Sequence, residues 1–540
     1  MSDKPSEATD GLIDALVIGG GHNGLINAAY LAKAGLKTLV LESRPFVGGA
    51  AITEELRPGF KFTTFSYAIS LLRPEITQDL SLVDHGLMIL PLIRTFQPGY
   101  AGNYLLLGPD GDENYHEIAR HSAADAEAYR DLSLLIKRTC FALKPLMDSI
   151  PPNRKGNTAE DQAHLEKFES YIAGLAPDIR AILDRFANST AADILDEYFE
   201  TDLLKAMLST SGIIGSRVSP RTKGSGLVWL FHKMGEYDGV FGEWGFHKAG
   251  NGGFTQVLAR AVAALGGTIR TNAPVASLLY ENGEVFGVRL ANGEEINAKI
   301  VVSSLDPRRT FNQLVRPVDL PQDLVDAINQ YEFWGVASKV NFALHDLPKF
   351  PGLENRSDIY MGFTNICPTI DYIEEAYADC LAGRFSRRPF MDCCVQSTLD
   401  PDMSPAGKHV MSCFVMYTPY RLANGDWTTE RKNLGDTVED TLDEFFPGFR
   451  NLVIQREVVT PDEIERCTGL TEGDIFGGAL DVKQMFFKRP AEGWNQYRTP
   501  IAGYYQCGSG THPGGAVTGG PGKLAAQQIL ADLSKSRNAS

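Results

Sequence analysis

The chain has 540 residues, of which 43% are hydrophobic and 22% are charged. This length is enough for about two to four domains, each with its own hydrophobic core. The 51 Lys and Arg against 67 Asp and Glu leave a formal net charge of −16. This charge argues against nucleic acid as the main partner, because binding phosphates needs a positively charged surface.

The first ten residues, Met1 to Asp10, are polar and acidic. They have neither the basic and apolar regions of a secretory signal nor the Arg-rich composition of a transit peptide. No run in the sequence approaches the ~18–20 apolar residues of a membrane span. We therefore expect a soluble, cytoplasmic protein. Peripheral contact with a membrane and association into homo-oligomers stay open.

A β-α-β unit is predicted at the start of the chain. An apolar strand over Asp14–Ile18 is followed at once by Gly19-x-Gly21-x-x-Gly24 and by a helix that ends at Gly35. A second apolar strand over Lys37–Leu41 ends in Glu42. A glycine pattern that follows a strand, opens a helix and has an acid after the next strand is typical of a dinucleotide site.

Each residue of this pattern has a physical role. Gly19 permits the tight turn, Gly21 lets backbone amides approach a pyrophosphate, and Gly24 lets the helix pack closely on the strand. The helix amino terminus supplies partial positive charge. Glu42 is placed to accept hydrogen bonds from ribose hydroxyls, and its charge disfavours a 2′-phosphate. A second glycine pair, Gly48-Gly49, favours FAD over NAD because it lets more backbone approach a long, flat cofactor.

The next part of the chain is predicted to be largely helical. Helical spacing extends from His116 to about Ile150, and it resumes from Leu175 to Met207. The polar stretch between them, about Asn153 to Glu166, is expected to be a loop.

A β-meander is predicted near the middle of the chain. A helix over Thr255–Leu265 ends at two glycines, and the strands that follow are separated by Asn282-Gly283 and Asn292-Gly293, the strongest short hairpin signals. The expected strands are 268–270, 275–280, 285–290 and 296–302. Residues from about 310 to 490 alternate strands and helices less regularly and contain many aromatic residues.

The carboxyl-terminal part combines a strand at Tyr504–Cys507, a glycine-rich loop over Gly508–Gly522 and a final helix. Free amides at that helix amino terminus favour a phosphate or the electron-rich edge of a reduced flavin. His512 and Tyr504 are weak candidates for catalytic groups, and core or loop packing is the competing interpretation for both. The segment Thr63–Tyr67 is a further candidate for the wall of the site.

Cysteine and histidine do not indicate metal or disulfide chemistry. None of the eight Cys forms a C-x-x-C pair, so neither a zinc ribbon nor a redox-active dithiol is predicted. The ten His are scattered, without an H-x-H or H-E-x-x-H cluster, and no metal site is expected. We expect the Cys to be buried, reduced thiols.

With these segments the chain resembles the FAD-dependent phytoene-desaturase-like oxidoreductases, within the wider amine-oxidase-like flavoprotein group. Two further segments, Ser70–Glu75 and Gly473–Phe476, look like the branch labelled as pyridine nucleotide-disulfide oxidoreductase domain proteins. The absent paired thiols give the disulfide part of that label no support. The resemblance extends over most of the chain, and the segments that carry it are Gly19–Leu25, Glu42–Gly49, Gly252–Phe254, Ser303–Pro307 and Thr511–Gly515.

The resemblance implies an α/β architecture in which a discontinuous, Rossmann-type FAD-binding domain holds an inserted substrate domain of mixed sheet and helices. The FAD-binding domain would comprise 12–70, 246–310 and 495–535, and the substrate domain 71–245 and 311–494. The backbone of Val275 would meet the adenine, and the Gly508–Gly519 loop the isoalloxazine and pyrophosphate. The implied FAD contacts are Gly19, Gly21, Gly24, Glu42, Arg44, Gly49, Ala50, Val275, Gly508, Pro513, Gly514, Gly515 and Val517.

The same resemblance implies carbon–carbon desaturation, saturation or double-bond isomerisation of a hydrophobic, polyene or isoprenoid-like molecule, with hydride transfer at flavin N5. Because no second G-x-G-x-x-G unit is present, a nicotinamide domain is not expected, and oxygen or a quinone would accept the electrons. Two alternatives stay open. One is an FAD-dependent oxidase of an amine or alicyclic small molecule, and the other is a flavin-binding interaction or regulatory protein without turnover.

Overall fold

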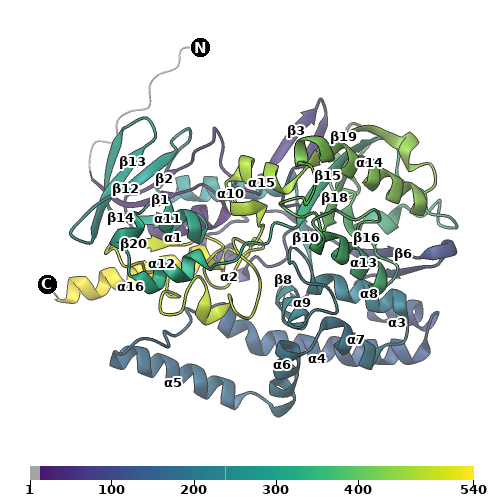
Figure 1. Ribbon diagram of the computed structural model, residues 1–540, viewed down its shortest axis with the longest axis horizontal. Coiled ribbons are helices and arrows are strands. Elements are labelled where there is room, and N and C mark those ends of the chain that lie inside the picture. Colours follow the sequence, from purple (N-terminus) through teal and green to yellow (C-terminus); the bar gives the residue numbers. More distant parts are fainter. Residues whose placement is uncertain (1–11, 238, 540) are drawn as a thin grey trace.

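A computed structural model describes residues 12–237 and 239–539 of the chain. The amino-terminal segment, for which the sequence predicts no targeting signal, lies outside these residues. No helix in the described ranges is long and apolar enough to cross a membrane. Two large sheets, one on each side of the view in Figure 1, organise the rest of the molecule.

The first sheet is mixed, with strand order β11-β2-β1-β14-β13-β12, and β20 pairs with β14. The neighbours around β1 are parallel, while β12, β13 and β14 form an antiparallel meander. Its strands are β1 (Ile13–Ile18), β2 (Thr38–Leu41), β11 (Thr268–Arg270), β12 (Val275–Glu281), β13 (Glu284–Leu290), β14 (Glu295–Ser303) and β20 (Tyr504–Gln506).

The parallel strands are apolar because helices cover both faces of the sheet. Ala15 and Val17 of β1 pack toward α1 (His22–Lys33), α10 (Gly250–Ala264) and α16 (Gly520–Ala539). Leu16 and Ile18 face the opposite side, toward α11 (Pro307–Asn312) and α12 (Gln322–Asn329).

The predicted β-α-β unit, meander and carboxyl-terminal strand are therefore confirmed. Asn282 and Gly283 both have positive φ, as a tight hairpin between twisted strands requires. The register pairs Glu281 with Glu284 across this turn.

The second sheet has strand order β19-β15-β18-β17-β16-β6-β7. It is mostly antiparallel, and only β6 and β16 pair in parallel. Helix α14 (Trp427–Phe445) contacts its edge strand β19, and α13 (Ile370–Leu381) follows β16 in the chain. Its strands are β6 (Arg94–Pro98), β7 (Tyr104–Leu107), β15 (Ala337–Leu344), β16 (Gly362–Ile366), β17 (Met391–Cys394), β18 (His409–Met416) and β19 (Val453–Val459).

A helical layer lies along the lower side of Figure 1 and packs on β7. Its core joins α4, α6, α7, α8 and α9, with Trp229 stacked on Phe186 at 5.1 Å between ring centroids. The helices are α3 (Gly111–Ala119), α4 (Ala123–Met147), α5 (Ala159–Gly174), α6 (Pro177–Asn188), α7 (Ala191–Tyr198), α8 (Asp202–Ser209) and α9 (Ser225–Lys233).

One element was predicted wrongly. The stretch from about 153 to 166 is expected to be a loop, yet α5 begins at Ala159. Thr158 and Asp161 form a reciprocal capping box, which satisfies amides at the helix start. None of the α5 residues is fully buried, so the segment lacks the apolar periodicity by which a helix is recognised in a sequence.

Shorter elements connect the two large sheets. Three two-stranded sheets pair β3 with β4, β5 with β10 and β8 with β9 in the described part of the chain. The division of the chain into an FAD-binding domain and a substrate domain stays a prediction. The remaining bounds are β3 (Thr53–Arg57), β4 (Phe60–Thr63), α2 (Pro74–Asp79), β5 (Ile89–Pro91), β8 (Glu236–Tyr237), β9 (Val240–Phe241), β10 (Gly245–His247) and α15 (Pro461–Thr468).

Candidate functional site

The amino terminus of α1 is open to a ligand. Its N-cap is Gly21, no side chain caps the helix, and no acidic residue occupies the first turn. The first amides of a helix lack partners within the helix, and they favour an anion. Gly24 has no room for a side chain, since a Cβ there would lie 2.1 Å from the carbonyl oxygen of Gly19. The tight glycine turn therefore brings backbone, and not side chains, to the start of α1.

Glu42 fixes this turn from the end of β2. Its Oε2 accepts a hydrogen bond from the Gly20 amide at 2.8 Å, and its Oε1 accepts one from the Arg44 amide at 2.9 Å. Arg44 in turn donates from Nη2 to the carbonyl oxygen of Gly49 at 2.6 Å. Gly21 bridges to Gly48, next to Gly49. The two predicted glycine segments thus lie against each other.

Val275 lies near the same corner of the first sheet. Two residues before it, the amide of Ala273 donates to the carbonyl oxygen of Glu42 at 2.9 Å. The amide of Asn272 donates likewise to Arg44 at 3.0 Å. The backbone before Val275 is therefore held beside Glu42, where the sequence predicts the adenosine part of the cofactor.

The carboxyl-terminal loop returns to the start of α1. Asn23 Nδ2 donates to Ser509 Oγ at 3.2 Å, and Asn27 Nδ2 donates to the carbonyl oxygen of Gly522 at 3.0 Å. A Cβ at Gly508 would lie 2.4 Å from the carbonyl oxygen of Leu305. Segments almost 490 residues apart in sequence therefore meet at one place.

Arg489 holds this loop from within the core. Its side chain is 0% exposed. The guanidinium donates to the carbonyl oxygens of Phe476, Gly478, Ala479, Gln484 and Ser509. Because the guanidinium has five N–H donors, it can satisfy several carbonyl groups that would otherwise be buried without partners.

The rest of the loop packs between α16 and the loop around Phe476. A Cβ at Gly520 would meet Pro513, one at Gly515 would meet the backbone of Phe476, and Gly514 lies near Leu480. Ala516 and Val517, both with positive φ, then face a cavity.

These residues fit FAD. The α1 amino terminus is uncapped, and the buried atoms His22 Nε2 and Asn23 Oδ1 have no hydrogen-bond partner among the described residues. Burial lowers the pKa of His22 to about 4, so its imidazole is neutral at pH 7. A backbone cradle with unpartnered donors and acceptors beside it is the kind of site that a dinucleotide occupies.

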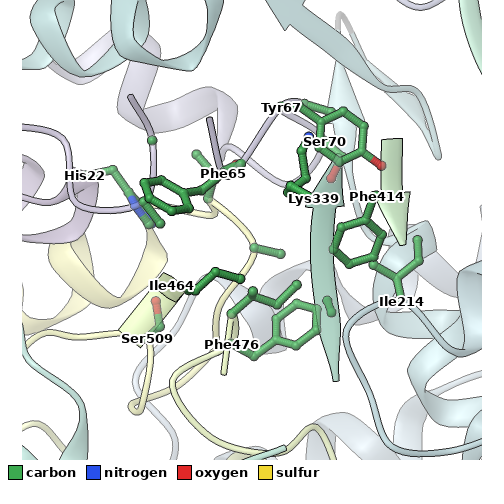
Figure 2. Close-up of a pocket in the computed structure, with 18 of the residues that line it drawn as sticks. His22, Phe65, Tyr67, Ser70, Ile214, Lys339, Phe414, Ile464, Phe476 and Ser509 are labelled. Atoms are coloured by element: carbon green, nitrogen blue, oxygen red, sulfur yellow. The ribbon is translucent and has the colours of Figure 1, made fainter. Parts of the chain in front are cut away.

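A cavity begins at this cradle and extends toward the second sheet. It encloses about 990 Å³ that protein atoms do not fill, solvent at its mouth included. Figure 2 shows His22 on one side of it and Phe414 and Ile214 on the other. The predicted cofactor segments contribute His22, Ala50, Ser509 and Val517, and the predicted Thr63–Tyr67 segment contributes Phe65, Ser66 and Tyr67.

The rest of the cavity wall is mainly apolar. It includes Ile214, Trp244, Phe414, Ile464 and Phe476. These side chains come from the segment between α8 and α9, the loop between β9 and β10, strand β18, helix α15 and the loop before Arg489, so the cavity lies where the predicted cofactor and substrate parts meet.

Lys339, on β15, is the one ammonium-bearing side chain of this wall within the described ranges. It is 2% exposed, and burial lowers its pKa to about 7. Its Nζ hydrogen-bonds Ser412 Oγ and lies 3.9 Å from the ring centroid of Tyr67. A buried amine with this pKa exchanges a proton near neutral pH.

Asp392, on β17, lies behind Tyr67. The Tyr67 hydroxyl donates to Asp392 Oδ2 at 3.0 Å. Burial raises the pKa of Asp392 to about 7, and it raises the pKa of the Tyr67 hydroxyl well above its ordinary value. Tyr67 therefore stays a neutral hydrogen-bond donor that joins the carboxyl of Asp392 to the wall of the cavity.

The two weak catalytic candidates lie elsewhere. His512 is 2% exposed, its Nε2 contacts the carbonyl oxygen of Leu146 at 3.0 Å, and burial lowers its pKa to about 4. The Tyr504 hydroxyl donates to the carbonyl oxygen of Thr310 at 3.1 Å in the core of the first sheet. Neither side chain lines the cavity.

Sequence reasoning missed Lys339 and Asp392. Lys339 stands in a strand whose eight residues are all buried, so a charged residue within an otherwise apolar run was the available signal. Asp392 is likewise a charged residue within a short buried strand, between Met391 and Cys393. No group of three His, Cys, Asp or Glu suited to a metal ion occurs within 12–237 and 239–539. All eight Cys are free thiols, and all but Cys467 are fully buried.

Comparison with known proteins gives a consistent result. The family model described as flavin containing amine oxidoreductase matches residues 24–530. A rat protein, pyridine nucleotide-disulfide oxidoreductase domain-containing protein 2 (Rattus norvegicus), is 37% identical over 96% of this chain and 94% of its own length. A limonene dehydrogenase polypeptide of Castellaniella defragrans is 28% identical over 96% of this chain and 95% of its own.

A lycopene-forming phytoene desaturase of Paracoccus is 25% identical over 96% of this chain and 97% of its own. Among solved structures, putrescine oxidase bound to putrescine superposes with a TM-score of 0.60 at 16% identity, covering 97% of this chain and 99% of the other. At that identity the likeness supports the fold alone. The expected α/β flavoprotein fold is confirmed.

Proposed function

We propose, from the premise that the chain belongs to the family of flavin-containing amine oxidoreductases and uses FAD, that it desaturates, saturates or isomerises carbon–carbon bonds of a hydrophobic, polyene or isoprenoid-like molecule. Oxygen or a quinone is the proposed electron acceptor for desaturation. Saturation would instead need a two-electron reductant, such as a quinol, to reduce the FAD, and isomerisation has no net electron transfer.

One observation carries this proposal: among the described residues, no Asp or Glu lines the cavity beside the FAD cradle. An alkylammonium substrate would therefore enter without a carboxylate to pair with its charge, and burying an unpaired charge is costly. The two His of the wall, His22 and His232, are neutral at pH 7 because burial lowers the pKa of each to about 4. A neutral, apolar molecule suits these walls.

The relatives give independent support. The limonene dehydrogenase polypeptide and phytoene desaturase are both named for hydrocarbon substrates, and the alignments to them extend over nearly the whole chain. The likeness to putrescine oxidase, by contrast, is one of fold.

The chain's own residues have defined tasks in the proposed reaction. FAD supplies the centre that exchanges a hydride with carbon. The apolar wall binds the substrate and excludes water. In the desaturation direction the neutral amine of Lys339 takes the proton that leaves the adjacent carbon, and Tyr67 and Ser412 hold Lys339 in place.

The test is anaerobic mixing of the FAD-loaded protein with limonene, phytoene, putrescine or cyclohexylamine while the visible flavin band is followed. Bleaching by limonene or phytoene, and not by the amines, is the expected result. Bleaching by an amine alone would establish the oxidase alternative. Substrates for saturation do not reduce the flavin, so the dithionite-reduced protein is also mixed with lycopene, and reoxidation of the flavin is monitored.

The non-enzymatic alternative makes a different prediction. A flavin-binding regulatory protein would hold FAD but show no flavin reduction or reoxidation with any of these compounds, and the compounds would be recovered with their double bonds unchanged. A protein that shows no flavin absorbance after incubation with FAD would contradict every version of the proposal.

A further inference from the structure

A second cavity lies beside the apolar one. It encloses about 960 Å³ that protein atoms do not fill, solvent at its mouth included. Trp244 and Ile214 line both cavities, and Trp244 packs edge-on against Phe363 of the second cavity at 5.4 Å between ring centroids. These two side chains therefore border both cavities, and the two cavities are neighbours.

The character of the second cavity is polar. Its lining includes five charged or amide side chains, those of Lys233, Asn365, Asp392, Arg94 and Glu243. Arg94 is engaged at the rim, with ion pairs to Glu113 at 3.2 Å and Asp358 at 3.9 Å. A head group bound here would meet charged and hydrogen-bonding side chains, in contrast to the walls beside the FAD cradle.

Two groups in this cavity lack partners. Lys233, the last residue of α9, forms no side-chain hydrogen bond or ion pair with any residue in 12–237 or 239–539. Burial lowers the pKa of Lys233, and the charge of the Glu243 carboxylate opposes this shift, but Glu243 lies too far away to form an ion pair with the Lys233 ammonium. Asp392 Oδ1 is buried without a hydrogen-bond partner, since only Oδ2 is used by Tyr67. An ammonium without a partner is costly to bury, and so is a carboxyl oxygen without one, so each is available to a ligand in this cavity.

We propose that the second cavity binds the carboxylate of an amphipathic substrate, with Lys233 as its ion-pair partner, while the apolar part of the same molecule reaches the cavity at the FAD cradle. This inference rests on the proposed function and narrows its substrate class. A contact between the Lys233 ammonium and a carboxylate is charge-assisted, and such contacts are stronger than hydrogen bonds between neutral groups.

The lining of the second cavity includes the exposed Pro109 and also Trp244, which borders the cavity at the FAD cradle. A molecule that enters past Pro109 with its apolar end first leaves its carboxylate at Lys233. The Tyr67–Asp392 hydrogen bond then connects the head-group cavity to the wall that carries Lys339.

The test is binding of dodecanoate and of methyl dodecanoate to the FAD-loaded protein, measured by calorimetry and by perturbation of the flavin spectrum. Dodecanoate is expected to bind about 10–100-fold more tightly than the ester, as an ion pair with an ammonium implies. Lys233→Met should remove that preference and leave ester binding within about twofold of wild type, because the change keeps the volume of the side chain. Lys233→Arg should retain part of it.

Lys137→Met is the matched control, since Lys137 is exposed on α4 and does not line either cavity. Equal affinities of the two probes for the wild type, or an unchanged preference in Lys233→Met, would overturn the inference. Tighter binding of dodecylamine than of dodecanoate, weakened by Glu243→Gln, would assign the cavity to a cationic head group instead. Calorimetry detects dodecanoate without turnover, so this result is independent of whether hydrocarbons reduce the flavin.

Discussion

The two halves of the site are made of different parts of the polypeptide. On the side of the first sheet, the contacts predicted for FAD come from backbone at Gly19, Gly21 and Gly49, fixed by Glu42. On the side of the second sheet, the cavity is made of side chains, among them the buried amine of Lys339. A site made of backbone groups allows few residue types at each position, because most side chains would block the ligand. In a site made of side chains, the pKa and the contacts of each group depend on the residues packed around it.

This difference separates what each half does. The backbone half is predicted to hold FAD, whose structure does not depend on the substrate. The side-chain half is proposed to select the substrate and to take up its proton. Substitutions should therefore affect FAD binding on one side and turnover or pH dependence on the other, and four predictions test this separation.

Lys339→Met should have the largest effect. We expect turnover to fall by about 10²–10⁴-fold, the usual contribution of a positioned acid or base, with FAD content unchanged. Because the pKa of Lys339 is about 7, the wild-type rate of desaturation should rise with pH through that value as the amine loses its proton, and the variant should lack this rise. Lys248→Met, at an exposed position, is the control. An unchanged pH–rate profile in Lys339→Met would contradict the assignment.

Asp392→Asn should change the pH dependence of stability. The pKa of Asp392 rises from 3.8 to about 7 on folding, so the folded protein binds more protons than the unfolded chain between these values. Its contribution to the free energy of unfolding therefore falls as pH rises from about 4 to 7, by an amount on the order of 4 kcal/mol at about 1.4 kcal/mol per pH unit.

The measurement for Asp392→Asn is urea unfolding at pH 5 and at pH 7.5. The variant should lose less stability between the two pH values than the wild type does. Asp371→Asn, on the surface of α13, should behave as the wild type. Equal losses in Asp392→Asn and the wild type would show that this carboxyl is ionised at little cost.

Arg489→Lys tests the connection between the halves. An ammonium has three donors and cannot reach the five carbonyl oxygens that the guanidinium satisfies, so buried acceptors lose their partners. We expect a loss of about 2–3 kcal/mol in the free energy of unfolding, together with weaker FAD binding. Denaturant titration with Arg421→Lys, at an exposed position, as control checks this. If Arg489→Lys were as stable as the wild type, water molecules would have to replace the lost hydrogen-bond donors.

Gly24→Ala should have the smallest effect, and it is confined to the backbone half. The added Cβ would lie 2.1 Å from the Gly19 carbonyl oxygen, and relief of the clash must move the turn. An overpacking cost of about 1–3 kcal/mol corresponds to FAD affinity lower by about 5–150-fold. Gly174→Ala, where a Cβ has open space, should bind FAD as the wild type does. Retained affinity in Gly24→Ala would show that the turn can adjust.

Much of the backbone half could be predicted from sequence. The first β-α-β unit, the meander with its Asn282-Gly283 hairpin and the final strand and helix all occur within a few residues of their predicted bounds. Position 24 must be glycine because the backbone of Gly19, only five residues earlier, leaves no room for a Cβ. A constraint between such close neighbours can be recognised from a short stretch of sequence. The α5 helix was missed because its stability comes from a cap at Thr158 and not from an apolar face.

The cavity could be predicted only in part. The segment Thr63–Tyr67 was expected at the site, and Phe65 and Tyr67 do line it. His512 and Tyr504 stood out in the sequence because they flank or follow glycines, yet both side chains are used for packing and backbone contacts. Lys339 did not stand out, because its altered pKa depends on strands and loops that are distant in the sequence.

The sequence by itself determined the cofactor class, the α/β architecture and the family, because these follow from local patterns of glycine, apolar strands and one acid. Tertiary structure alone decided which side chains share a cavity. Lys339, Tyr67 and Asp392 come from three separate segments, and burial changes the pKa of each only after the second sheet has formed around them. The same holds for Lys233, because only the tertiary structure places its unpaired ammonium in the lining of the second cavity.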